Sequence, residues 1–73
     1  MRLPSLKPRE VVRALEKAGF EKMRQTGSHL ILAHRKTMRI VTVPMHSGDI
    51  HRGLVIGIIK QAGLTRREFA ELL

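Results

Sequence analysis

The segment from residue 20 to residue 46, FEKMRQTGSHLILAHRKTMRIVTVPMH, constrains the fold most, because it separates two stretches of helical pattern. It is rich in Val, Ile, Leu and Thr, and it contains a turn signal, Thr-Gly-Ser, with a second turn expected around residues 35–38. Pro44 should end the last strand, since proline cannot donate a ladder hydrogen bond. The pattern predicts three short strands joined as hairpins, at about 20–25, 29–34 and 39–44.

The predicted strands differ in how clearly they show an inner face. In the third, Val41 and Val43 alternate with Ile40 and Thr42, which gives one apolar face. In the second, residues 30–33 read Leu-Ile-Leu-Ala and place apolar side chains on both faces. That pattern suits a central strand, or a sheet whose outer face meets another protein.

Helical patterns flank the strands. Pro8 suits a first helical position and Gly19 a stop, which predicts a helix over about 8–18. A second helix is expected from about 54 to 62, with Gly63 as its stop. The core-facing positions of the two helices fall at helical spacing: Val11, Ala14, Leu15 and Ala18 in the first, and Val55, Ile58, Ile59 and Ala62 in the second.

The sequence Thr65-Arg-Arg-Glu68 fits a capping box that opens a short third helix, with Phe69 and Leu72 as its apolar contacts. The order α-β-β-β-α with an extra terminal helix predicts an α+β fold. We expect a two-layer domain over residues 1–73, with helices on one face of a three-stranded antiparallel sheet. The longest apolar run, residues 53–59, is too short to cross a bilayer, so a soluble, cytoplasmic protein is expected.

Charge narrows the function. Fourteen Lys and Arg oppose six Asp and Glu, and the formal net charge of +8 favours a polyanion partner, with nucleic acid first. The alternative is a basic surface that is simply solvated. The chain has two Phe and no Trp or Tyr, so it cannot stack many single-stranded bases on aromatic rings. It should therefore hold a nucleic acid mainly through charge and shape.

His29 follows the Gly27-Ser28 turn, where the second strand begins. It is either a hairpin-corner residue or a general acid/base, a role that suits histidine because it exchanges protons near neutral pH. In the catalytic interpretation Ser28 fixes the turn and Gly27 allows its backbone dihedral. The nearby cations Lys22, Arg24 and Arg35 would hold a phosphodiester.

Other chemistries fit the residues poorly. The chain has no cysteine, and Ser28 and His29 are adjacent in an expected strand, so they point to opposite faces. His29 and His34 are five residues apart, which also puts them on opposite faces, and neither has a carboxylate cluster nearby, so no metal or other cofactor is expected. RNA cleavage without a metal stays possible, because the substrate supplies its own 2′-hydroxyl nucleophile.

As a set, the elements LEKAGF, RQTGSH, VTVPMH and IIKQAGLT, in this order, resemble the HicA family of toxin–antitoxin systems over about residues 5–65. The resemblance implies a fold like that of double-stranded RNA-binding domains. It also implies an mRNA interferase, an endoribonuclease that halts translation, and a HicB-type antitoxin partner. One departure is Gly53-Leu54-Val55, where the family often has Gly-Thr-Leu.

By this resemblance the catalytic histidine is His29, in the family's Gly-Ser-His motif. His46 also occupies a motif position, as a second acid/base, as an RNA-positioning group, or as a loop residue without a role. The leading hypothesis is a toxin ribonuclease. The alternative is a non-catalytic module of the same fold that binds RNA. A DNA-binding repressor is disfavoured, because no helix-turn-helix with a basic recognition helix is evident.

Overall fold

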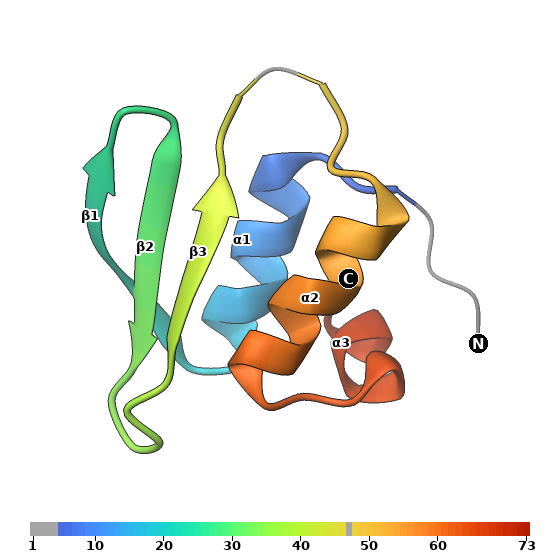
Figure 1. Cartoon of the computed structure of the whole chain (residues 1–73). Coiled ribbons are helices and arrows are strands. Elements are labelled where there is room, and N and C mark those ends of the chain that lie inside the picture. The colour runs from blue at the N-terminus through green and yellow to red at the C-terminus, as the bar shows by residue number, and fades with distance from the viewer. Residues whose placement is uncertain (1–4, 47) are drawn as a thin grey trace.

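The three strands form one antiparallel sheet in the order β1-β2-β3, and all the helices lie on one side of it (Figure 1). The structure is a computed structural model that describes residues 5–46 and 48–73. Its elements confirm the predicted α+β fold and order. They are α1 (Pro8–Lys17), β1 (Phe20–Thr26), β2 (His29–His34), β3 (Ile40–Pro44), α2 (Arg52–Ala62) and α3 (Arg66–Leu72).

The helix boundaries follow from the residues that cap them. Pro8 is the first residue of α1, as predicted. Helix α2 begins two residues earlier than expected, because the ring Nδ1 of His51 accepts a hydrogen bond from the backbone N–H of Leu54 at 3.4 Å. The predicted capping box of α3 is present, since Thr65 and Glu68 each bond the other's backbone N–H.

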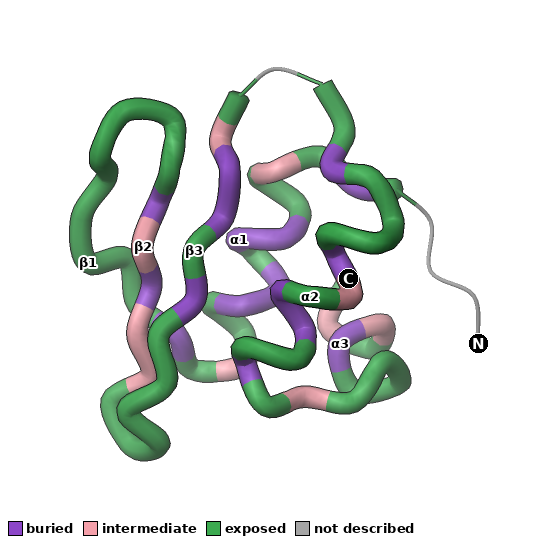
Figure 2. The backbone as a smooth tube through the Cα atoms, in the orientation of Figure 1, coloured by how far each residue is buried: buried purple, intermediate pink, exposed green. Residues whose placement is uncertain are grey.

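The core lies between the sheet and the helices. Alternate residues of β2 and β3 are buried in it, and every residue of the predicted α2 stripe is buried (Figure 2). Helix α3 contributes Phe69, which is fully buried against the same cluster. The buried strand residues are Phe20 in β1, Leu30 and Leu32 in β2, and Val41, Val43 and Pro44 in β3.

β2 is the central strand, and its outward side chains stay uncovered by helices. Leu30 and Leu32 face the core, so Ile31 and Ala33 face the other way and are only half-buried. The two possibilities raised by the apolar pattern are therefore compatible: β2 is central, and apolar side chains also line the open face. We use "open face" for the side of the sheet that carries the outward residues of the three strands.

The β1–β2 hairpin is closed by the two residues Gly27 and Ser28, with Thr26 paired to His29. Gly27 has a positive φ of 58°, whereas the φ of Ser28 is not positive. A glycine at positive φ in the first central position is the pattern of a type II′ turn, which matches the twist of the flanking strands. The turn therefore fixes His29 at the start of β2.

A short backbone bridge joins the start of the chain to the loop before α2. The N–H of Leu6 donates to the carbonyl of Ile50 at 3.1 Å, and the N–H of Ile50 donates back at 2.6 Å. Both side chains are buried. The bridge holds the beginning of α1 beside the segment that follows β3.

Candidate functional site

His29 lies on the open face of the sheet, at the rim beside the β1–β2 turn. Its side chain is exposed, and it alternates with the buried Leu30 along β2. Its cross-strand partners are Thr26 on β1 and Pro44 on β3. Directly paired residues share one face of a sheet. The imidazole is thus presented to solvent beside the Thr26 hydroxyl.

Arg24 is the basic residue of the predicted set that shares this face with His29. It pairs with Ile31, which is two residues along β2 from His29 and therefore on the same side. Diagonal neighbours of this kind have Cα atoms roughly 7–8 Å apart, within reach of a long side chain. A guanidinium and an imidazole can therefore meet one phosphate at this corner.

Lys22 points to the other side of the sheet. It pairs with the buried Leu32, and the register shifts between Lys22 and Arg24, so the two cations diverge. On the helix side Lys22 lines a hollow of about 280 Å³ with Arg9, Arg13 and one carboxylate, on Glu16, all from α1. We call this the α1–β1 groove. The structure does not bring Lys22 and His29 onto one face.

Arg35 is also separated from His29. It follows the last residue of β2, six residues further along, and six strand residues span about 20 Å. Its guanidinium makes an exposed ion pair with Glu21 at 3.0 Å. The three cations expected to clamp one phosphate are therefore divided among three places, and Arg24 alone of them is positioned to act with His29.

Ser28 fixes the turn through its backbone. Its carbonyl accepts a hydrogen bond from the N–H of Met45 at 2.5 Å, which extends the pairing of β2 and β3 past Pro44. The residue is exposed and precedes His29 directly. This bond ties the turn to the segment that carries His46.

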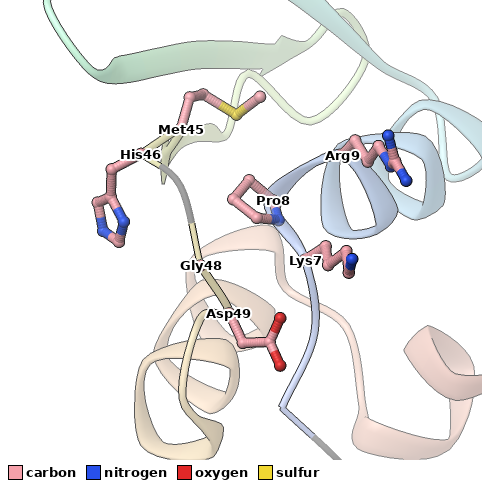
Figure 3. A pocket seen from close by; sticks show the side chains of 7 residues that line it. All are labelled: Lys7, Pro8, Arg9, Met45, His46, Gly48 and Asp49. Carbon is pink, nitrogen blue, oxygen red and sulfur yellow. The ribbon is translucent and has the colours of Figure 1, made fainter.

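His46 is exposed and lies just past β3, next to the turn that holds His29. It borders a hollow of about 480 Å³ at the beginning of α1 (Figure 3). In this view Met45 and His46 point to different sides of the segment. The hollow has mixed charge, with Lys7 just before α1, Arg9 in its first turn and Asp49 on the loop.

The two remaining histidines have structural roles. His51 caps α2. His34 is half-buried, and its Nδ1 accepts hydrogen bonds from the backbone N–H groups of Lys36 and Thr37, both at 3.2 Å. Its Nε2 therefore carries the proton and donates to the carbonyl of Ala18 at 3.2 Å.

The α1 cations are the part of this surface that sequence reasoning missed. Arg9 and Arg13 are four residues apart, so they lie on one helix face, next to the buried stripe. That spacing was visible in the sequence. Their closeness to Lys22 was not, because it depends on how α1 crosses β1.

The described residues contain no helix that is both long and apolar enough to span a membrane. Within residues 5–46 and 48–73, His, Asp and Glu side chains form no group of three that would hold a metal ion. The open face instead offers an imidazole, a guanidinium and a hydroxyl, from His29, Arg24 and Thr26. Groups of these kinds can transfer protons and bind anions.

Comparison with known proteins agrees with the sequence motifs. The family model described as the HicA toxin of bacterial toxin–antitoxin systems matches residues 8–64, from the start of α1 to just past α2. No individual curated protein matches the chain. The matched region includes the whole sheet and the Gly27-Ser28-His29 corner. The chain therefore belongs to the HicA family and is a toxin of a toxin–antitoxin system.

Proposed function

We propose that this toxin is an endoribonuclease that cleaves messenger RNA in the cytoplasm, with His29 as general acid/base. The observation that carries the proposal is the place of His29, exposed at the rim of the open face beside Arg24 and Thr26. Membership of the HicA family supports a toxic activity. A basic, aromatic-poor chain favours a polyanionic target held by charge.

The reaction is transesterification within the RNA. The 2′-oxygen attacks the adjacent phosphorus while the bond from phosphorus to the 5′-oxygen breaks, which leaves a 2′,3′-cyclic phosphate and a 5′-hydroxyl. His29 removes the proton from the 2′-hydroxyl or donates one to the leaving oxygen. Arg24 neutralises charge on the phosphate. This chemistry requires no metal or cofactor.

His46 is the candidate for the second proton transfer. It follows Met45, which is bonded to the turn that holds His29. If His46 instead only positions RNA, its replacement weakens binding without removing the chemistry. Lys22 with Arg9 and Arg13 would hold a further stretch of backbone in the α1–β1 groove.

The test is cleavage of a labelled RNA by the purified toxin under single-turnover conditions. Losing a general acid or base typically lowers the rate about 10²- to 10⁴-fold. His29→Ala and His29→Gln should both lose at least 10²-fold, because glutamine keeps hydrogen bonding but cannot titrate. His51→Gln is the matched control, since that histidine serves as a helix cap.

Two substrate controls sharpen this test. An RNA with a single 2′-deoxy nucleotide at the cleaved position should resist the toxin, and a chelator should leave the rate unchanged. A folded His29→Ala variant that cleaves within about threefold of wild type would contradict the catalytic role. Tight RNA binding by a wild-type toxin that never cleaves would favour the non-catalytic RNA-binding module instead.

A further inference from the structure

Apolar side chains gather on the open face at the end opposite His29. Met23, Met38 and Ile40 are 62%, 77% and 63% exposed. They surround a hollow of about 290 Å³ whose floor includes Ala33. We call this feature the Met23–Ile40 hollow. Exposed apolar side chains grouped around a hollow mark an interaction site more often than scattered ones do.

The backbone of Met38 points to the same conclusion. Among the described residues, Met38 is the one non-glycine residue with a positive φ, which is 65°. This conformation disfavours a side chain with a Cβ atom, and non-glycine residues that adopt it occur in turns and cluster at functional sites. Glycine would relieve it, yet the chain places a large apolar side chain there and leaves that side chain in water.

Hydrogen bonds hold the β2–β3 turn in this shape before any partner arrives. The carbonyl of His34 accepts from the N–H of Met38 at 2.8 Å, and the N–H of His34 donates to the carbonyl of Arg39 at 2.9 Å. The ring of His34 accepts from two further N–H groups of the turn. A surface that is ordered in advance loses little conformational entropy on binding.

The charge around the hollow indicates which kind of partner binds there. Residues 35–39 read Arg-Lys-Thr-Met-Arg, so cations flank Met38 on both sides. The one carboxylate lining the hollow, on Glu21, is bonded to Arg35. A second copy of a chain with net charge +8 would be repelled. RNA fits less well, because most of the lining is apolar, its one arginine, Arg35, is paired with Glu21, and its one ring, on His34, is half-buried and packed against Phe20.

We infer that the Met23–Ile40 hollow is the anchor point of the antitoxin: an acidic segment of that protein inserts one apolar side chain among Met23, Met38 and Ile40. The inference rests on the antitoxin partner that membership of the family implies. Ala33 is four residues along β2 from His29, a span of about 13 Å. The anchor and the catalytic corner are therefore separate parts of the open face, and each can be altered alone.

The test measures the affinity of the purified cognate antitoxin for variants of the full toxin. Ile40→Glu and Met38→Gly should each weaken binding about tenfold to hundredfold, as loss of an anchor side chain does. Met38→Gly should also raise the unfolding midpoint or leave it unchanged, because glycine accepts the positive φ. Leu54→Glu is the matched control, since Leu54 is an exposed apolar residue on α2, outside the hollow.

Several results would overturn the inference. The first is an antitoxin affinity that is the same for Ile40→Glu, Met38→Gly and the wild-type toxin. A wild-type dimer that Ile40→Glu dissociates would assign the hollow to a second copy of the toxin. Loss of RNA affinity in Ile40→Glu beyond that in Leu54→Glu would assign it to RNA. Failure of the wild-type toxin to cleave RNA would overturn the proposed function and leave this binding test valid.

Discussion

Two histidines of the same strand show how position decides the role of a residue. His29 and His34 are the first and last residues of β2, five apart, and face opposite sides of the sheet. His34 bonds both ring nitrogens to backbone groups and its ring lies edge-on to Phe20, with 5.1 Å between centroids. His29 is left exposed on the face that carries Arg24, where the proposed proton exchange with a substrate would take place.

At the residue scale, the two arginines of the predicted phosphate clamp should differ. Arg24→Ala should lower the single-turnover cleavage rate by about tenfold or more, because its charge is on the face of His29. Arg35→Ala should change the rate by less than about twofold, since Arg35 lies at the far end of β2 and is paired with Glu21. Equal losses in the two variants would contradict this geometry.

The cations also show which part of the candidate site could not be predicted from the sequence. The motif located His29, and the turn signal located Gly27 and Ser28. Lys22 and Arg24 are two residues apart, so strand periodicity alone would put them on one face. The register shift between them breaks that periodicity, and no residue in the stretch signalled it.

At the element scale, the junction of α1 and β1 depends on a glycine. Gly19 has φ 105°, and a Cβ atom there would lie 2.7 Å from Nε2 of His34. That nitrogen is bonded to Ala18, so the ring cannot move without losing a hydrogen bond. The stop signal read from the sequence is thus also a packing requirement, which appears only when β2 is placed beside the end of α1.

Gly19→Ala should therefore destabilise the fold by about 1–3 kcal/mol. Gly57→Ala is the matched control: Gly57 is inside α2 with open space around it, so alanine should stabilise by roughly 0.5–1 kcal/mol. Thermal melts followed by circular dichroism would measure both. In a His34→Ala background the cost of Gly19→Ala should fall, and an unchanged cost would show that the contact with the ring is unimportant.

At the scale of the whole molecule, the order of elements, their approximate bounds and the α2 core stripe were predictable, while the predicted α1 stripe included the half-buried Ala18 and left out the buried Val12. In a chain this short, apolar periodicity and turn residues permit few arrangements. What could not be predicted is how the cations and exposed apolar groups distribute over the two sides of the sheet. Arg9 and Lys22 line the α1–β1 groove, while Met23 and Ile40 line the hollow on the open face.

This distribution predicts that RNA affinity depends on where charge lies as well as on how much there is. The net charge of +8 should make binding fall steeply with salt, by about 0.7 log units per log unit of salt for each single-strand phosphate neutralised. Removing three groove cations, as Arg9→Ala, Arg13→Ala and Lys22→Ala together, should lower that slope by roughly 2. All measurements use the His29→Ala background, so that the RNA stays intact.

A second triple variant distinguishes the effect of where the positive charge lies from the effect of how much there is. Lys60→Ala, Arg66→Ala and Arg67→Ala remove the same charge from the end of α2 and from α3, where the side chains are exposed. Figure 1 shows α3 on the far side of the helix layer from β1. These side chains lie outside the groove, so their loss lowers the long-range attraction of RNA without changing how many groove phosphates are neutralised. The salt slope should therefore stay within about 0.5 of the slope of the His29→Ala protein. Equal slopes for the two triple variants would mean that the whole basic surface, and not the α1–β1 groove, holds the RNA.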